Sequence, residues 1–235
     1  MTDDAASSAA DGPTGVTADV TTAAARDGEP DGWNAIVLGG GRGERLGGVS
    51  KSDLEVGGRA LLDRTLEALA GARDVVVVGG PRRAGVRWTV EDPPGGGPAE
   101  GVVAGLRALA ADGASAAWTV VLAVDTPGAA DALPRLLAAR AGDGSASREG
   151  ARLDGAQLVD ADGRAQPLIA VYRTTSLHAA ALTAMTAADP PGRASGMSMR
   201  TLVGELRLAP VADRGDTAHD LDTWDDVQFW KERLG

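Results

Sequence analysis

Short apolar runs alternate with helix-like patterns along the chain from residue 33 onward. The apolar runs predict strands at Trp33–Leu38, Asp74–Val78, Trp88–Glu91, Trp118–Val124, Ala156–Val159, Leu168–Tyr172 and Leu206–Val211. Apolar positions three and four residues apart predict helices at Ala60–Ala70, Pro98–Ala111, Asp131–Arg140, Thr174–Ala187 and Thr223–Arg233. Strands that alternate with helices are typical of a doubly wound sheet. We therefore predict a single α/β domain with a doubly wound, mostly parallel sheet and flanking helices.

The first 31 residues do not share this pattern. They are rich in Ala, Thr, Asp and Gly and contain almost no large apolar side chain, so burial cannot offset the entropy of ordering them. They also lack the basic start and apolar centre of a secretory signal. We expect residues 1–31 to be a disordered acidic tail and residues 32–235 to be the folded domain. A true start codon further along the gene would also explain the composition of this segment.

The composition excludes several kinds of chemistry. The chain has no cysteine, which excludes disulfides, thiolate metal sites and cysteine nucleophiles, and its two histidines cannot form a histidine-rich metal site. No apolar run reaches the roughly 18 residues of a membrane span, so we expect no membrane contact. Residues 1–32 hold seven acidic residues and one basic residue. The net charge is therefore −10 for the whole chain but only −4 for the residues that follow. Because there is no basic stripe, we expect no nucleic-acid partner.

A glycine-rich segment, Leu38–Lys51, directly follows the first predicted strand and reads LGGGRGERLGGVSK. Its glycines let the backbone approach a ligand closely and direct successive N–H groups toward phosphate oxygens. Arg42, Arg45 and Lys51 add positive charge to an otherwise acidic protein. The segment therefore predicts a polyphosphate site, although a plain strand-to-helix connection is the alternative.

The spacing within this segment excludes two common phosphate-binding loops. A Walker A loop needs glycine immediately before its lysine, whereas Ser50 precedes Lys51. A Rossmann fingerprint needs a third glycine where this chain has Leu46. The remaining pattern is G-G-x-G-x-R, with a lysine six residues after the arginine. This pattern is characteristic of nucleotidyltransferases that bind a nucleoside triphosphate.

Two aspartates follow predicted strands, at the sheet edge where ligands bind in such folds. Asp125 follows a wholly apolar strand. A bound Mg²⁺ would offset the cost of burying this carboxylate, because Mg²⁺ typically uses one or two carboxylates plus substrate phosphates. The alternative is that Asp125 caps the next helix. Asp92 precedes a run rich in proline and glycine, which predicts either a loop over the base or ribose or an ordinary surface loop.

Further candidates lie near the C-terminus and in the strand that begins at Gln166. Asp220 and Asp222 share one side of an extended segment, which makes Asp222 a candidate second metal ligand. Asp222 or Thr223 as the N-cap of the last helix is an equally open interpretation. The start of the strand at Gln166 either faces a second substrate or belongs to a simple core strand. His219, next to Asp220, is a candidate member of the site.

Together these segments resemble the molybdenum cofactor guanylyltransferases, within the nucleotidyltransferases that have a Rossmann-like fold. The segments occur in the order of that family and cover nearly all of residues 33–235. They are Leu38–Lys51, Val75–Val78, Glu91-Asp92, Gly97-Pro98-Ala99-Glu100-Gly101, Asp125-Thr126-Pro127, Gln166-Pro167-Leu168 and Asp220-Leu221-Asp222-Thr223.

The resemblance implies transfer of GMP from GTP to molybdopterin with release of pyrophosphate, and Mg²⁺ as cofactor. In this reaction the cations and glycine amides hold the β- and γ-phosphates and stabilise the leaving pyrophosphate. The expected nucleotide-binding residues are Leu38, Gly39, Gly40, Gly41, Gly43, Lys51, Asp92 and Asp125. The expected catalytic residues are Arg45, Lys51 and Asp125, and the expected metal ligands are Asp125 and Asp222. We also expect a cytoplasmic location and transient contact with molybdenum cofactor proteins.

The chain departs from the family pattern at several positions. Ser50 replaces a frequent aspartate, Gly79 an asparagine, Gly128 an aromatic residue, and Asp220-Leu221-Asp222-Thr223 an Asn-x-Asn-Thr motif. These departures bear on base choice more than on fold or reaction, and closely similar enzymes transfer CMP to the same pterin. The alternatives are therefore a cytidylyltransferase, or another NTP transferase with the same or another phosphorylated acceptor, and a non-catalytic nucleotide-binding regulatory module.

Overall fold

The computed structural model of the protein describes residues 32–40, 46–92, 94–111, 113, 116–140, 152–188 and 196–235. The predicted tail of residues 1–31 lies outside these ranges. Among the helices of the described part, none is long and apolar enough to cross a membrane.

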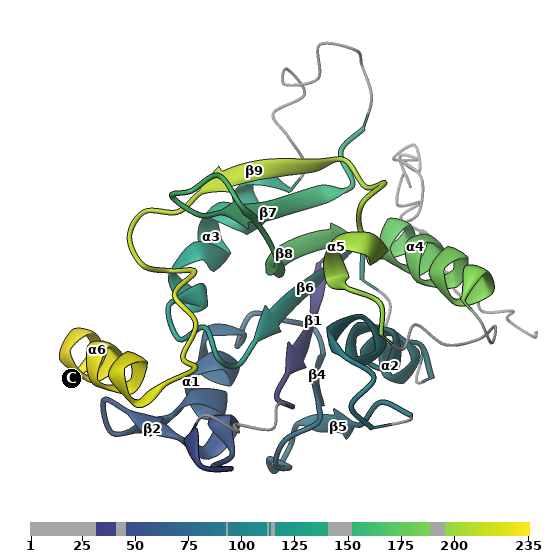
Figure 1. Ribbon diagram of the computed structural model, residues 1–235. Coiled ribbons are helices and arrows are strands. Elements are labelled where there is room, and N and C mark those ends of the chain that lie inside the picture. Colours follow the sequence, from purple (N-terminus) through teal and green to yellow (C-terminus); the bar gives the residue numbers. More distant parts are fainter. Residues whose placement is uncertain are drawn as a thin grey trace, which may run out of the picture.

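A seven-stranded sheet forms the centre of the molecule, with the strand order β5-β4-β1-β6-β8-β7-β9 (Figure 1). Its strands are β1 (Trp33–Leu38), β4 (Val75–Val78), β5 (Arg87–Thr89), β6 (Trp118–Ala123), β7 (Gly155–Val159), β8 (Ala165–Arg173) and β9 (Leu208–Ala212). The pairs β1–β4, β1–β6, β4–β5 and β7–β9 are parallel. The predicted single α/β domain with a mostly parallel sheet is therefore confirmed.

Strand β8 runs opposite to the other strands, because it pairs antiparallel with both β6 and β7. A turn at residues 160–163 joins β7 to β8, and it is closed by a hydrogen bond from the N–H of Asp160 to the carbonyl of Arg164 at 3.0 Å. In the pairing with β6, Ile169 lies opposite Leu122. The start of β8 therefore lies at the same edge of the sheet as the end of β6.

Helices cover both faces of the sheet (Figure 1). One face packs against α1, α3 and α6, and the other packs against α2, α4 and α5. These helices are α1 (Leu61–Ala68), α2 (Pro98–Ala111), α3 (Ala129–Ala139), α4 (Thr174–Ala187), α5 (Met199–Leu202) and α6 (Trp224–Leu234). Because β1 and β6 are covered on both sides, their sequences are mostly apolar rather than alternating, and the polar Asn34 and Thr119 are buried with their neighbours.

Helix α2 lies unusually close to β1. A Cβ atom at Gly105 would be 2.7 Å from Cγ2 of Ile36, and one at Gly101 would be 3.0 Å from a methyl group of Leu38. The two glycines therefore let the helix pack directly on the strand that leads into the glycine-rich segment.

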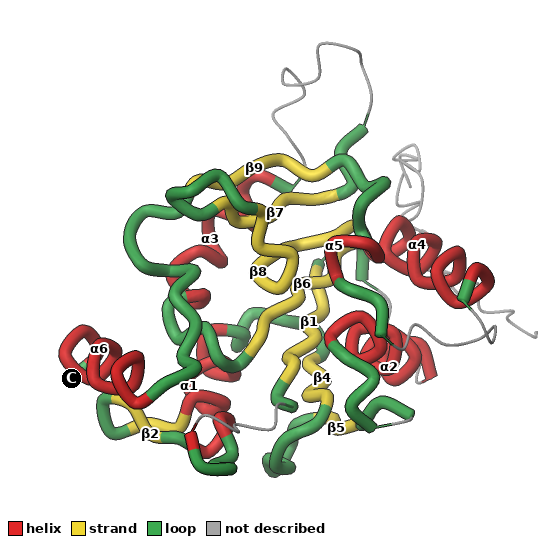
Figure 2. The backbone as a smooth tube through the Cα atoms, viewed as in Figure 1, coloured by secondary structure: helices red, strands yellow, loops and turns green. Residues whose placement is uncertain are grey.

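Two small elements follow that segment and were absent from the sequence prediction. A 3-10 helix, η2 (Lys51–Asp53), precedes a hairpin of β2 (Glu55–Val56) and β3 (Arg59–Ala60). The hairpin turns through Gly57 and Gly58, both with positive φ. Figure 2 shows that β1, β4 and β6, which run parallel, end at the same edge of the sheet. A ligand site at that edge can therefore draw residues from the loops that follow these three strands.

Candidate functional site

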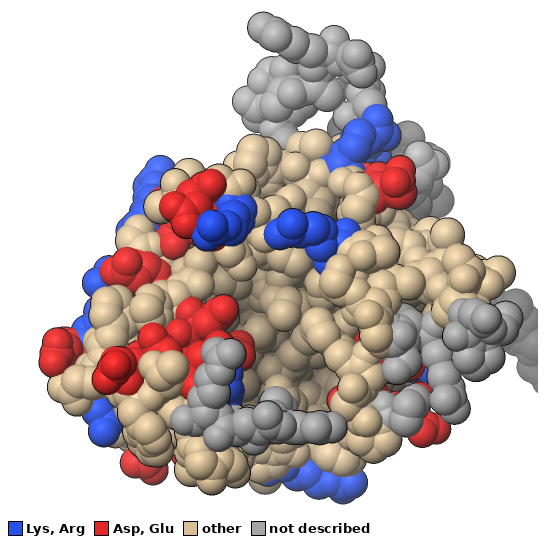
Figure 3. Space-filling model, viewed as in Figure 1, with Lys and Arg blue, Asp and Glu red and all other residues tan. Residues whose placement is uncertain are grey.

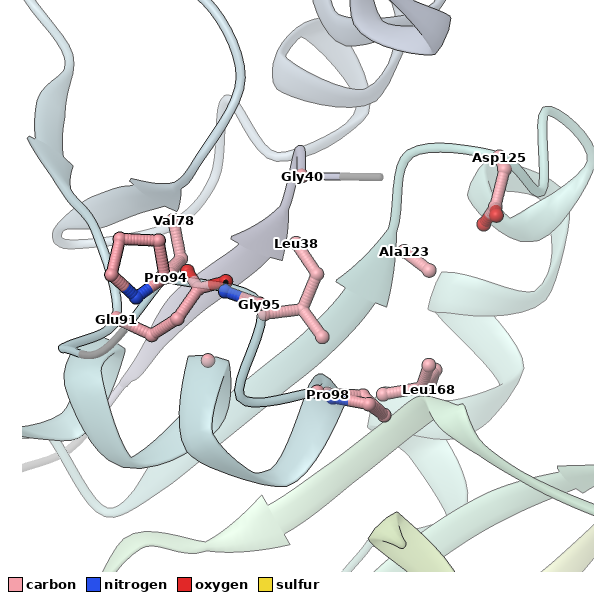
Figure 4. A pocket seen from close by; sticks show the side chains of 12 residues that line it. Leu38, Gly40, Val78, Glu91, Pro94, Gly95, Pro98, Ala123, Asp125 and Leu168 are labelled. Atoms are coloured by element: carbon pink, nitrogen blue, oxygen red, sulfur yellow. Dashed lines mark hydrogen bonds between the residues drawn. The ribbon is translucent and has the colours of Figure 1, made fainter. Parts of the chain in front are cut away.

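A cleft of about 530 Å³ opens at this edge of the sheet. Figure 3 shows it as a hollow in the viewed face, with acidic side chains on the side toward α6 and basic side chains along the upper rim. In Figure 4, Glu91 and Pro94 lie at one end, Asp125 lies at the other, and Leu38 lies between them. The lining residues are Leu38, Gly40, Val78, Glu91, Pro94, Gly95, Gly97, Pro98, Gly101, Ala123, Asp125 and Leu168.

The glycines after β1 and β4 pack against each other beside this cleft. Gly39 N donates to the carbonyl of Val78 at 2.9 Å, and the buried Ser52 hydroxyl donates to the carbonyl of Gly39 at 2.7 Å. Gly80 has φ +63°, and a Cβ atom there would lie 2.6 Å from the same carbonyl oxygen. The close approach of the two strand ends therefore requires glycine at this position.

Lys51 lies in η2 and reaches two carboxylates from distant parts of the chain. Its Nζ donates to Oδ2 of Asp125 at 3.0 Å and also to Oδ1 of Asp222. The lysine side chain is only 11% exposed. Burial acts to lower its pKa, but the hydrogen bonds and negative charges of Asp222 and Asp125 outweigh burial and raise the pKa above 10.5. Lys51 is therefore a fixed cation at neutral pH.

Asp125 is held at the end of β6 and does not cap a helix. The N-cap of α3 is Gly128, which makes no side-chain capping bond, and the Thr126 hydroxyl turns back to the carbonyl of Ala123 at 2.9 Å. The Asp125 side chain is 31% exposed and lines the cleft. The interpretation of Asp125 as a helix cap is therefore wrong, and the carboxylate is available to a ligand in the cleft.

The C-terminal segment brings Asp222 to the same place. Leu221 is fully buried, and its N–H donates to the carbonyl of Asp125 at 2.7 Å. Thr223 is the N-cap of α6, with its hydroxyl accepting from the N–H of Asp226. The N-cap interpretation is therefore confirmed for Thr223, while the neighbouring Asp222 contacts Lys51 and its role as a metal ligand stays a prediction.

A third carboxylate, Asp220, lies near this pair. Partial desolvation and then the negative charges of Asp125 and Asp222 raise its pKa to about 6. The charge of Lys51 acts in the opposite direction but does not cancel these effects. The site therefore has an excess of negative charge that a bound cation would relieve.

The donor set fits Mg²⁺ that is shared with a substrate. Asp125 and Asp222 converge on one point, the ammonium of Lys51, and offer the hard oxygen ligands that Mg²⁺ prefers. Within the described ranges, no group of three or more acidic or histidine side chains could hold a metal ion by itself. An ion bound by these carboxylates beside the Lys51 ammonium would need phosphate oxygens to complete its coordination, as is usual for Mg²⁺ in nucleotide sites.

Other predicted site residues lie either outside the described ranges or away from the lining of the cleft. Gly41, Gly43 and Arg45 lie outside the described residues. Asp92 is exposed and is not among the lining residues of the cleft. Its neighbour Glu91 lines the cleft instead and accepts a hydrogen bond from Gly95 N at 3.0 Å. Asp92 was the expected nucleotide contact of the Glu91-Asp92 pair, and only the fold shows that Glu91 is the side chain that lines the cleft.

Two candidate site residues, Gln166 and His219, contact residues that stabilise the fold rather than the cleft. Gln166 donates to Oδ2 of Asp160 at 2.9 Å, so it stabilises the β7–β8 turn, while Leu168 further along the strand reaches the cleft. His219 pairs with Asp226 at 2.8 Å and stacks on Phe229 with ring centroids 4.5 Å apart. His219 therefore packs on α6 rather than joining Lys51.

Comparison with known proteins identifies relatives of this chain. The MobA-like NTP transferase domain matches residues 35–202. A molybdenum cofactor guanylyltransferase of Acidiphilium cryptum (strain JF-5) is 33% identical over 201 residues, which are 82% of this chain and 91% of the relative.

Solved structures show the same fold. Molybdopterin-guanine dinucleotide biosynthesis protein A from Archaeoglobus fulgidus aligns with a TM-score of 0.57 and 18% identity, over 86% of this chain and 97% of that one. A 2-C-methyl-D-erythritol 4-phosphate cytidylyltransferase from Thermus thermophilus aligns with a TM-score of 0.56 and 21% identity, over 85% and 96%. The domain match covers most of the chain and the relative is similar over nearly its whole length, so this chain belongs to the MobA-like NTP transferase family and is a nucleotidyltransferase.

Proposed function

We propose that this nucleotidyltransferase transfers GMP from GTP to molybdopterin and releases pyrophosphate. The observation that carries the proposal is the position of Lys51, a part-buried cation between Asp125 and Asp222 at one end of the cleft. A cation next to two carboxylates suits a triphosphate that arrives with a divalent ion. The relative from Acidiphilium cryptum, named a molybdenum cofactor guanylyltransferase, supports the choice of substrates.

The cleft offers distinct surfaces for the parts of the nucleotide. Leu38, Val78 and Leu168 provide apolar surface for a base, and Glu91 provides a hydrogen-bond acceptor at the end away from Asp125. Gly40 also lines the cleft, so the backbone can approach the phosphates closely. The triphosphate then points toward Lys51 and Asp125.

The reaction needs little covalent chemistry from the protein. A phosphate oxygen of the acceptor forms the new bond to the α-phosphorus of GTP, and the bond to the β-phosphate oxygen breaks. Because that acceptor oxygen is already ionised at neutral pH, no general base is required. Lys51 stabilises the negative charge that develops on the leaving pyrophosphate.

Asp125 and Asp222 would hold the Mg²⁺ ion. Bound there with the triphosphate, the ion would neutralise charge on the phosphate oxygens. The carboxylates also fix the position of the Lys51 ammonium, because both accept a hydrogen bond from it.

The proposal is tested by pyrophosphate release with each of the four nucleoside triphosphates, Mg²⁺ and molybdopterin. We expect release with GTP and, in parallel, selective protection by GTP against thermal unfolding, since a ligand of the native state raises its stability. Release with CTP instead would identify a cytidylyltransferase, which Gly79 keeps open because it supplies no side chain to contact the base. Nucleotide binding without release would identify a binding module.

A further inference from the structure

The carboxylate of Asp226, in the first turn of α6, ties together the segment that carries Asp222. Its Oδ2 accepts from the N–H of Asp222 at 3.0 Å, the N–H of Thr223 at 2.7 Å and the hydroxyl of Thr223 at 2.8 Å. Its Oδ1 lies 2.8 Å from Nε2 of His219. The two oxygens therefore hold groups on both sides of the site residue.

An ordinary capping box explains only part of this arrangement. In a capping box, the side chain at the third helical position bonds the backbone N–H of the N-cap residue, which is Thr223 here. The bonds from Asp226 to Asp222 N and His219 lie outside the helix and add nothing to the cap itself. They instead fix the approach of residues 219–222 to α6.

Helix α6 and the segment before it are both fixed to the loop that carries Asp125. Trp230 is 2% exposed, and a Cβ atom at Gly128 would lie 2.7 Å from its ring, so the ring packs directly on the loop after β6. The bond from Leu221 N to the Asp125 carbonyl, 2.7 Å long, joins the same two segments at the site. A shift of α6 or of its N-terminal segment therefore moves Asp222 relative to Asp125.

We propose that Asp226 is a positioning residue that holds Asp222 in place beside Lys51, with His219 orienting the Asp226 carboxylate. The proposal rests on the proposed function for its kinetic consequence, because Lys51 and Asp222 act there on the triphosphate. Its structural part stands apart from that function: Asp226 fixes the backbone of Asp222.

Four variants separate positioning from capping. Asp226→Ala removes all four bonds, whereas Asp226→Asn keeps an amide oxygen that can accept from the N–H groups of Asp222 and Thr223. Thr223→Ala removes the capping hydroxyl but leaves the bond to Asp222 N. Asp225→Ala is the matched control, because it removes the neighbouring exposed carboxylate from the same helical turn.

Two measurements are made on each variant of the full chain: hydrogen exchange of a peptide over residues 219–224, and kcat and KM for GTP. We expect Asp226→Ala to accelerate exchange of this peptide, since its amides lose their acceptor. We expect kcat to fall by about 10²-fold, the scale of a misplaced catalytic group. We expect KM for GTP to change by less than about threefold, as for an interaction made in the transition state. Asp226→Asn should recover most of the kcat, and Asp225→Ala should match the wild type.

Two results would overturn the proposal. One is an Asp226→Ala protein with unchanged exchange at residues 219–224. The other is a Thr223→Ala protein that loses as much kcat as Asp226→Ala, because the effect would then belong to the helix cap. If the wild type shows no guanylyl transfer, the proposed function fails while the exchange measurement still decides whether Asp226 holds Asp222. If Asp226→Ala does not fold, Asp226→Ser replaces it in the same comparison, because one short hydroxyl cannot make the bonds to Asp222 N, Thr223 N and His219 together.

Discussion

The Lys51 ammonium lies 3.0 Å from the Asp125 carboxylate, although the two residues are 74 positions apart in the sequence. Their proximity follows from the topology of the sheet. Lys51 comes after β1 and Asp125 comes after β6, and these neighbouring strands are parallel. The carboxyl ends of parallel neighbours meet at one edge, so a cation that follows one strand can pair with an acid that follows the other.

Replacement of Lys51 by alanine should reduce turnover by about 10²-fold or more, by analogy with the removal of one charge-stabilising donor from an active site. The measurement is pyrophosphate release at saturating GTP and molybdopterin. Lys231→Ala is the matched control, because Lys231 is the other lysine of the chain and is exposed in the last turn of α6. Near-wild-type release by Lys51→Ala would contradict the assigned role.

Replacement of Asp125 by asparagine should separate binding from turnover. The variant keeps the shape of the side chain but removes its charge, so we expect most turnover to be lost, by at least about 10²-fold. The cleft walls remain, so GTP should still raise the melting temperature of the variant in thermal scans. Asp131→Asn, at an exposed acid in the first turn of α3, controls for the change in net charge. An Asp125→Asn enzyme that turns over normally would exclude this carboxylate from the reaction.

Two glycine substitutions should differ in their effect on stability. Gly85 has φ +74° and no atom within 4 Å of an added Cβ, so Gly85→Ala should cost only the left-handed backbone strain, about 1–2 kcal/mol. Gly80 has a similar φ, but its Cβ would meet the backbone carbonyl of Gly39 at 2.6 Å. Gly80→Ala should therefore cost clearly more, about 3 kcal/mol or above when a steric shift is added to the strain. Urea unfolding followed by tryptophan fluorescence measures both, and equal losses would contradict the packing described for the two strand ends.

Much of the fold could be predicted because its signals are local. The continuous apolar run at Trp33–Leu38 and the helical spacing at Pro98–Ala111 gave the bounds that the structure has. The small hairpin of β2 and β3 was missed, although Gly57-Gly58 is a hairpin turn signal. Its strands have only two residues each, which is too short for a hydrophobic pattern to emerge.

The candidate site was harder to predict, because it depends on packing between distant segments. The sequence singled out Lys51, Asp125 and Asp222 separately. Their convergence requires the C-terminal segment to dock on the loop after β6 through Leu221, which a local pattern cannot reveal. The same applies to Asp226, whose role depends on the path of the chain before α6.

The raised pKa of Asp220 predicts that this carboxylate destabilises the protein at neutral pH. Its pKa is about 6 in the folded protein because of desolvation and the charges of Asp125 and Asp222, against an ordinary value of 3.8. A group with a raised acid pKa binds its proton more tightly when folded, so the penalty is fully present above pH 6 and disappears as the pH falls below 3.8. Without divalent cations, Asp220→Asn should therefore melt higher than the wild type at pH 7–8.

Because Asp220 is exposed, solvent screens these charges, and the rise in melting temperature of Asp220→Asn should be small, about 1–3 °C. The difference in melting temperature should shrink between pH 6 and pH 4 and should also shrink when Mg²⁺ is added, since a cation relieves the same repulsion. Asp225→Asn, at an exposed acid in the same segment, should give an offset that Mg²⁺ does not change. A gain for Asp220→Asn that is constant from pH 4 to pH 8 would show that the three carboxylates do not interact. Their negative charge would then give no reason for a metal ion to bind at this site.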